Sequence, residues 1–174
     1  MANANTPPNV VPQRIALIAA IGKNYVLGKD NELVWHLPAD WENFRRVTKD
    51  KPFVMGRTSY ESSDMLYSEG RNIILTSRNL EGLPDNFEVA RGIPEALARL
   101  KEEPEVFILG GGKVYEQTID LANYLYLTLV HHDFDGDTFF PKPQWDQWLL
   151  VKSVYQAVDE RHQYDFSLNE YRRK

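Results

Sequence analysis

The feature that most constrains the fold is an alternation of short apolar runs with amphipathic segments of helical length. The apolar runs are as long as β-strands and lie at residues 14–21, 53–55, 72–77, 87–90, 106–109 and 124–130. Helical patterns follow at residues 38–50, 94–103 and 113–120. Two strand patterns, 149–155 and 164–171, close the chain without a helix between them. This order predicts an α/β domain with a mostly parallel sheet and an antiparallel C-terminal edge.

Length and charge are those of an ordinary globular protein. A chain of 174 residues suggests one domain with a substantial core. The 20 basic and 25 acidic side chains leave a net charge of −5, which argues against a protein built mainly to bind nucleic acid. No apolar run is long enough to cross a bilayer. Residues 1–13 are polar and rich in Asn and Pro, and they predict a flexible N-terminal tail before a domain over residues 14–174.

The chain has no cysteine, and this limits its chemistry. It excludes a disulfide framework, a thiol nucleophile and a cysteine metal site, and it fits a cytoplasmic location. A metal site from other residues is not predicted either. His131 and His132 are adjacent and would point to opposite faces of a strand. The acidic run at 133–137 begins like a calcium loop but lacks the closing Glu, so we interpret it as a polar turn.

One acidic residue stands where a carboxylate is least expected. Pro38 suits the first turn of a helix. A helix that starts there places Asp40, Phe44 and Val47 on one face, at i, i+4 and i+7. A charge on an apolar face is costly without a partner. Asp40 is therefore either a functional acid or a first-turn residue that favours the positive end of the helix dipole. Thr128, in the middle of an apolar strand, is a possible partner for it or simply a good strand former.

Three loops that follow strands carry glycine, hydroxyl or basic groups. They are Gly56-Arg57-Thr58-Ser59, Thr76-Ser77-Arg78 and Gly110-Gly111-Gly112-Lys113, and Arg91 could join them. In a parallel sheet such loops meet at the carboxyl ends of the strands, where helix N-termini and glycines favour phosphate. Each loop alone has an ordinary explanation, and Thr58 with Glu61 also fits a capping box. Together they predict a nucleotide site without the usual G-x-G-x-x-G spacing.

Several motifs, in their order and spacing, make the sequence similar to the bacterial dihydrofolate reductases over residues 15–171. They are LIAAI at 17–21, W-x-LPAD at 35–40, KPFVMGRTSYES at 51–62, NIILTSR at 72–78, ILGGGKVYEQ at 108–117, YLT at 126–128 and GDTFFP at 136–141. The resemblance implies a single-domain fold with an eight-stranded sheet and about four flanking helices. It also implies hydride transfer from NADPH to 7,8-dihydrofolate, which gives tetrahydrofolate for one-carbon metabolism. By the same resemblance, the protein is expected to be a cytoplasmic monomer and a target of antifolates.

The same resemblance implies roles for individual residues. Asp40 would hold the pterin and promote protonation of its N5 through a water molecule, with Thr128 bonded to it. The implied catalytic set is completed by Trp35, Leu33 and Tyr115. The implied NADPH-binding residues are Ala20, Leu27, Gly28, Gly56, Arg57, Thr58, Ser59, Leu75, Thr76, Ser77, Arg78, Arg91, Gly110, Gly111, Gly112, Lys113, Val114, Tyr115 and Gln117. The implied substrate-binding residues, besides Asp40 and Thr128, are Ile18, Ala19, Ala20, Trp41, Phe44, Ser63, Tyr67, Arg71 and Leu109. The loop over residues 22–32 would be a mobile lid.

The chain departs from the family pattern at three places. Val34 stands before Trp35, where the family usually has Pro. Ser63 and Tyr67 replace common aliphatic residues. Family members also carry an Arg two residues before the Asn of the third strand, and it grips the folate glutamate. Here Arg71 directly precedes Asn72, so either the loop differs and Arg71 still reaches, or the clamp is weakened.

Two other functions are open from the sequence. The nearest is another NADPH reductase of the same fold, such as the reductase domain of riboflavin synthesis, which lacks the LPAD acid. The second is a non-catalytic nucleotide-binding module. Such a module would explain the glycine and basic loops but not an acid on an apolar helix face, so Asp40 argues against both.

Overall fold

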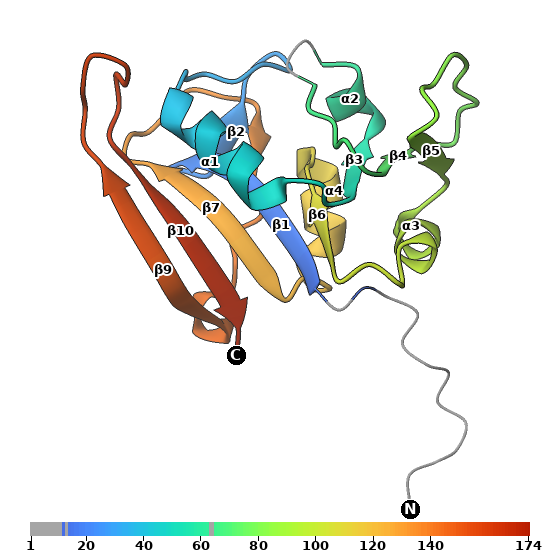
Figure 1. Ribbon diagram of the computed structural model, residues 1–174. Coiled ribbons are helices and arrows are strands. Elements are labelled where there is room, and N and C mark those ends of the chain that lie inside the picture. Colours follow the sequence, from blue (N-terminus) through green and yellow to red (C-terminus); the bar gives the residue numbers. More distant parts are fainter. Residues whose placement is uncertain (1–11, 13, 63–64) are drawn as a thin grey trace, which may run out of the picture.

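The computed structural model describes residue 12 and residues 14–62 and 65–174. In this part of the chain, eight strands form one sheet in the order β5-β4-β3-β6-β1-β7-β10-β9 (Figure 1). All neighbours are parallel except β7–β10 and β10–β9. The strands of this sheet are β1 (Arg14–Gly22), β3 (Phe53–Gly56), β4 (Asn72–Leu75), β5 (Phe87–Ala90), β6 (Glu105–Ile108), β7 (Tyr124–Val130), β9 (Trp148–Gln156) and β10 (Phe166–Arg173). The predicted mostly parallel sheet with an antiparallel C-terminal edge is confirmed.

Four α-helices connect the parallel strands. They are α1 (Pro38–Thr48), α2 (Arg57–Tyr60), α3 (Ile93–Arg99) and α4 (Gly112–Thr118). A short second sheet pairs β2 (Val26–Gly28) with β8 (Thr138–Phe139), and a 3₁₀ turn, η1 (Trp145–Gln147), precedes β9. The second sheet was not predicted, because strands of three and two residues are too short for a period to be visible in the sequence.

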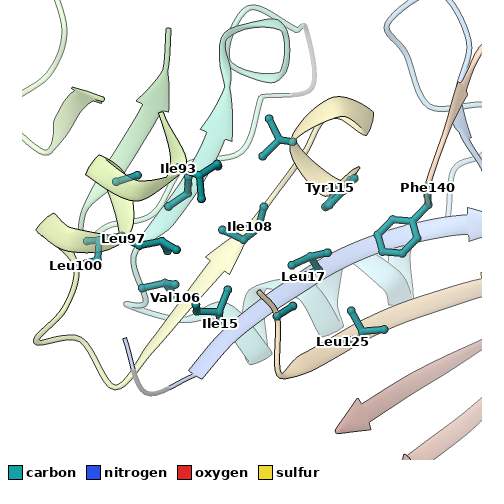
Figure 2. Packing of buried hydrophobic residues seen from close by; sticks show 14 of the residues in the cluster. Ile15, Leu17, Ile93, Leu97, Leu100, Val106, Ile108, Tyr115, Leu125 and Phe140 are labelled. Carbon is teal, nitrogen blue, oxygen red and sulfur yellow. The ribbon is translucent and has the colours of Figure 1, made fainter. Parts of the chain in front are cut away.

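The core occupies both faces of the sheet. In β1, Ile15 and Leu17 point to the face covered by α3 and α4, as Figure 2 shows. Ala16 and Ile18 point to the opposite face, where Phe44 of α1 packs. This two-sided burial explains why β1 is apolar at nearly every position rather than at alternate ones.

The antiparallel edge differs from the rest of the sheet. The β9–β10 hairpin reaches beyond α1 at one side of the molecule, with β5 at the opposite side (Figure 1). Most of β9 is exposed, while β10 is largely buried between β7 and β9. The turn of this hairpin, however, returns to the start of α1, where His162 contacts Ala39.

One sequence prediction is wrong, and two others fall on residues that the structure does not describe. The capping box from Thr58 and Glu61 is wrong, because the N-cap of α2 is Gly56 and Thr58 lies inside the helix. Glu61 instead ends α2 and forms an ion pair with Arg57, at 2.7 Å. The predicted tail over residues 1–13 lies outside the described residues apart from Pro12, and so does Ser63. Those two predictions stay predictions.

Candidate active site

The site is a cavity of about 570 Å³ between α1 and the carboxyl ends of the central strands. Its floor comes from the middle of β1 and β7, through Ile18, Ala19, Ala20, Tyr126, Leu127 and Thr128. One wall is α1, with Asp40, Trp41 and Phe44. The loop after β2 and the segment after α2 form the rim, and Leu109 and Gly111 come from the end of β6. The cavity thus lies where ligands bind in parallel sheets.

Asp40 and Thr128 meet in this cavity. The Thr128 hydroxyl donates a hydrogen bond to Asp40 Oδ1 over 2.5 Å. Strand pairing places Thr128 beside Ala20 of β1, so the hydroxyl stands at the centre of the floor. Pro38 starts α1 and puts Asp40 in its first turn, directly above that hydroxyl. The helix dipole therefore favours this carboxylate, but Asp40 is no surface residue, because it lines the cavity.

The surroundings change the acidity of Asp40. Burial raises the pKa of its carboxyl from the ordinary value to about 6, and the hydrogen bond from Thr128 opposes part of that rise. Burial acts in this direction because it disfavours the charged form. Asp40 can therefore hold or release a proton near neutral pH, which is what a group that assists proton transfer requires.

Trp35 and Leu33 flank the cavity in different ways. Trp35 is buried and does not line the cavity; it packs in the cluster that holds Ala20 of the cavity floor, with its ring 4.9 Å from that of Phe134. Among the described residues its indole Nε1–H is the one buried side-chain polar atom without a protein partner. A buried donor without a partner is costly, so this N–H points to a water molecule as its acceptor. Leu33 is 39% exposed and lies on the rim of the cavity.

The glycine loop after β6 packs tightly against its neighbours. Gly110 has a φ of +109°, and a β-carbon there would lie 3.0 Å from the Tyr115 ring. The N–H of Gly56 donates to the carbonyl of Gly110 over 2.8 Å, which joins the ends of β3 and β6. The Tyr115 hydroxyl donates to the carbonyl of Ile18 over 2.7 Å, and its ring lines the cavity. Helix α4 begins at Gly112, so its first N–H groups have no partner within the helix.

The basic residues predicted to bind a nucleotide lie outside the cavity but at neighbouring strand ends. Strands β4, β3 and β6 are adjacent, so the loops after them lie side by side. Arg91, after β5, donates to the carbonyls of Thr76 and Arg78, at 3.2 and 3.1 Å. Arg57, after β3, is paired with Glu61. The structure thus gathers these side chains along one edge of the sheet.

The outer substrate residues are not brought to the cavity. Arg71 forms two hydrogen bonds with the Glu88 carboxylate, at 2.9 and 3.1 Å, and one with the carbonyl of Arg99. Tyr67 is 59% exposed, and neither residue lines the cavity. In this structure all three guanidinium nitrogens of Arg71 donate to protein groups, so the contact of Arg71 with the substrate stays a prediction. Sequence reasoning missed several lining residues that carry no chemical signature: Asn31, Glu32, Met55, Ser62, Met65, Leu66, Tyr126, Leu127 and Thr138.

A comparison with protein families shows to which family the chain belongs. The family model described as dihydrofolate reductase matches residues 14–173, nearly the whole chain. The chain belongs to the dihydrofolate reductase family. The similarity predicted from the LPAD and GGG motifs is thereby confirmed, and so is the predicted enzyme class.

Individual dihydrofolate reductases agree with this assignment. The enzyme of Staphylococcus haemolyticus is 36% identical over 160 residues, covering 92% of this chain and 96% of its own. That of Haemophilus influenzae is 39% identical, covering 86% and 92%. A solved structure of the Enterococcus faecalis enzyme, complexed with NADP(H) and RAB-propyl, superposes with a TM-score of 0.82 at 32% identity. It covers 94% of this chain and 99% of its own, so the fold is confirmed over the whole domain.

Two kinds of feature are absent from the residues that the structure describes. None of the helices in this part of the chain is long and apolar enough to cross a membrane. Within the same residues, no group of three or more His, Cys, Asp or Glu side chains could hold a metal ion.

Proposed function

We propose that this chain reduces 7,8-dihydrofolate to 5,6,7,8-tetrahydrofolate with NADPH, and that Asp40 assists the protonation of N5. The observation that carries the proposal is the pair of Asp40 and Thr128 in an apolar cavity beside the glycine loop. The reaction adds a hydride to C6 and a proton to N5 of the pterin. NADPH supplies the hydride, and the protein aligns the two rings and excludes water.

Asp40 has two tasks in this proposal. Its carboxyl accepts hydrogen bonds from the N3 and 2-amino groups of the pterin, which fixes the ring against the floor of the cavity. Because burial raises the pKa of the Asp40 carboxyl to about 6, this group also promotes the protonation of N5, and a water molecule delivers the proton. The buried Nε1–H of Trp35, which has no protein partner, would hold a water molecule. Thr128 keeps the carboxyl in position.

The apolar walls would hold the rest of the substrate. Ile18, Ala19, Ala20, Trp41, Phe44 and Leu109 all line the cavity and would enclose the pterin and benzoyl groups. The Trp41 and Phe44 rings stand edge to face with centroids 6.4 Å apart. Such a wall excludes water, which strengthens every electrostatic contact with Asp40.

The residues present fit a dinucleotide. Gly110 and Gly56 have no room for a β-carbon without displacing Tyr115 or Val114, so glycine lets the loop after β6 pack against the end of β3. At Gly111 an added β-carbon would meet only Ser59 Oγ, at 3.7 Å, so the backbone there leaves space for a ligand. The nicotinamide half would contact Ala20, Leu27, Gly28, Gly111, Gly112, Lys113, Val114, Tyr115 and Gln117. The adenosine half would contact Arg57, Thr58, Ser59, Leu75, Thr76, Ser77, Arg78 and Arg91, with the basic groups around the 2′-phosphate that separates NADP from NAD.

The residues of the rim would close over the bound ligands. Leu33 and the loop over residues 22–32 are proposed to form a lid. Gly28 of this loop accepts a hydrogen bond from the N–H of Asp137, so the lid is anchored to the segment before β8. We further propose that the protein works as a monomer in the cytoplasm, where tetrahydrofolate serves one-carbon metabolism. Analytical ultracentrifugation of the purified chain tests the oligomeric state.

The test is NADPH oxidation at 340 nm with dihydrofolate, in the wild-type protein and in Asp40→Asn. We expect dihydrofolate-dependent oxidation in the wild type and a loss of roughly 10²-fold or more in Asp40→Asn at neutral pH, with NADPH affinity kept within about threefold. NADPH binding without dihydrofolate-dependent oxidation would favour a non-catalytic module. Oxidation that needs a different, flavin-precursor substrate would favour the riboflavin-type reductase.

A further inference from the structure

Helix α1 begins without a cap from its own sequence. Its N-cap residue is Leu37, whose side chain cannot accept a hydrogen bond, and Pro38 has no N–H group. The first N–H group of the helix that needs an acceptor therefore belongs to Ala39. That residue directly precedes Asp40, so whatever holds this N–H also holds the turn from which the acid projects.

The acceptor comes from the opposite end of the chain. The N–H of Ala39 donates to Nε2 of His162 over 3.1 Å, across 123 positions of sequence. His162 lies in the turn between β9 and β10 and is only 2% exposed. Its ring packs against Phe166, with centroids 5.4 Å apart. A side chain this deeply buried has little freedom, so its position defines where the helix starts.

Asp159 determines which ring nitrogen of His162 can accept. Nδ1 of His162 lies 2.7 Å from Asp159 Oδ1. Because Nε2 accepts from Ala39, the proton of the neutral ring must sit on Nδ1, from where it is donated to Asp159. The Asp159 carboxylate is held in turn by the N–H of Arg161, at 2.9 Å, and by Gln156 Nε2, at 3.1 Å. The ring is therefore fixed in both orientation and tautomer.

The same hairpin touches α1 a second time, but that contact is weaker. Arg161 forms an ion pair with Glu42 at 2.7 Å, and both side chains are more than half exposed. Exposed pairs of this kind contribute little, because water screens them. The buried contact between His162 and Ala39 is the one able to fix the helix start.

We infer that His162, oriented by Asp159, is a positioning residue for Asp40: it caps the first turn of α1 and so keeps the carboxyl over Thr128. The inference deepens the proposed function and rests on it for the role of Asp40. A displacement of about 1 Å in a reacting group can lower a rate by about 10²-fold, so a loose first turn has a large effect on chemistry. The cofactor residues belong to other elements and are not touched by His162.

The experiment compares three variants of the full chain with the wild type. His162→Phe keeps a ring against Phe166 but removes the acceptor, and His162→Gln restores an acceptor of similar reach on a flexible side chain. The matched control is His131→Phe, because His131 also bonds within the antiparallel edge, to Ser167 at 2.8 Å, but does not contact α1. Single-turnover hydride transfer with NADPH and dihydrofolate is recorded against pH, together with NADPH affinity.

We expect His162→Phe to slow hydride transfer at least tenfold and to shift its pH profile, while NADPH affinity changes less than twofold. His162→Gln should recover most of the rate, and His131→Phe should resemble the wild type. An unchanged rate and pH profile in His162→Phe would overturn the inference. So would an equal loss in His162→Phe and in the His131→Phe control.

Two further measurements keep the test decisive. If His162→Phe does not fold, Asp159→Ala is used instead. It removes the partner that orients the His162 ring by a change at an exposed residue, and the same shift in pH profile is expected from it. Hydrogen exchange of the Ala39 amide needs no substrate, and it should become at least tenfold faster in His162→Phe than in the wild type. Unchanged exchange would reject the cap itself. Faster exchange in a protein that does not reduce dihydrofolate would leave the cap standing and reject the proposed function.

Discussion

Thr128 and Asp40 are 88 positions apart in sequence, yet the hydroxyl of one donates to the carboxyl of the other over 2.5 Å. One residue comes from the centre of β7 and the other from the first turn of α1. The pair joins the sheet to the helix at the point where the chemistry takes place. It also sets two opposing influences on one carboxyl, since burial raises its pKa and the hydrogen bond lowers it.

Removing the Thr128 hydroxyl should shift the pH profile upward. In Thr128→Val the hydrogen bond that lowers the pKa of Asp40 is lost, so this pKa rises above about 6. A hydrogen bond of ordinary strength corresponds to roughly 0.5–1 pH unit. The rate of hydride transfer depends on the protonated form of Asp40, so the pH profile has a falling limb where Asp40 loses its proton. In Thr128→Val this limb should move to higher pH by that amount. Single-turnover kinetics between pH 5 and pH 9 measure the limb.

The control for this variant is Thr118→Val. Thr118 is also buried, and its hydroxyl donates to the carbonyl of Val114 over 2.7 Å, inside α4. Its loss should lower stability without moving the limb. A limb that stays in place in Thr128→Val, or moves to lower pH, would contradict the assignment.

Asp40→Asn should be more stable than the wild type at neutral pH. In the folded state the pKa of Asp40 is raised to about 6, against about 3.9 in an unfolded chain. A raised carboxyl pKa means that the folded state binds the proton more tightly. Stability is then full below about pH 4 and is lost as the pH rises through about 6, by roughly 2–3 kcal/mol.

An uncharged Asn does not undergo this loss. The difference in unfolding free energy between Asp40→Asn and the wild type should therefore grow from pH 4 to pH 8 in favour of the variant. Urea unfolding at both pH values measures it. A constant difference across this range would show that Asp40 does not titrate as the structure indicates.

Gly110→Ala should weaken both stability and NADPH binding. The backbone at Gly110 has a φ of +109°, and an added β-carbon would lie 3.0 Å from the Tyr115 ring. Such a conformation costs a non-glycine residue about 1–3 kcal/mol. Displacement of Tyr115 would also disturb the cavity wall. Thermal unfolding and NADPH titration measure the two effects.

Gly82→Ala is the matched control for this substitution. Gly82 also has a positive φ, of +70°, but nothing lies within 4 Å of its added β-carbon. It should lose some stability and keep its NADPH affinity. Equal NADPH affinities in the two variants would argue against a role of Gly110 in cofactor binding.

Arg71→Ala should leave substrate recognition nearly unchanged. The Arg71 guanidinium is bonded to Glu88 and to the carbonyl of Arg99, away from the cavity. We expect the KM for dihydrofolate to change less than about threefold, with a stability loss of up to about 1 kcal/mol for this partly exposed pair. Steady-state kinetics with dihydrofolate and with dihydropteroate, which lacks the glutamate, measure the contribution. A tenfold rise in KM for dihydrofolate alone would mean that Arg71 leaves Glu88 to bind the glutamate.

Much of the secondary structure was readable from the sequence because local patterns decide it. The run RIALIAAI is apolar at consecutive positions, and β1 is indeed buried on both faces. Pro38 marks the start of α1, and the spacing of Asp40 and Phe44 put both on the cavity side. Residues 72–77 were predicted as a strand, but β4 ends at Leu75, because Thr76 bonds within the turn that follows, to the N–H of Arg78.

Local patterns failed where a side chain had two possible partners. Thr58 and Glu61 have the spacing of a capping box, but Glu61 pairs with Arg57 instead. Arg71, near the position of a substrate clamp, is paired in this structure with Glu88 on the neighbouring strand β5. In both cases the spacing of the sequence does not reveal the partner of a charged side chain, and the fold places an oppositely charged side chain beside it.

The amino-acid sequence by itself thus determined the order of strands and helices, the unusual place of Asp40 and the family. These depend on spacing along the chain, and spacing is a local property. The family resemblance implied that Thr128 meets Asp40, and the structure shows this hydrogen bond. Only the tertiary structure decided that His162 meets the N–H of Ala39. Those meetings depend on strand register and on the return of the β9–β10 hairpin to α1, and neither has a local signal. A buried hydrogen bond is made between whichever groups the packing of the whole chain brings together.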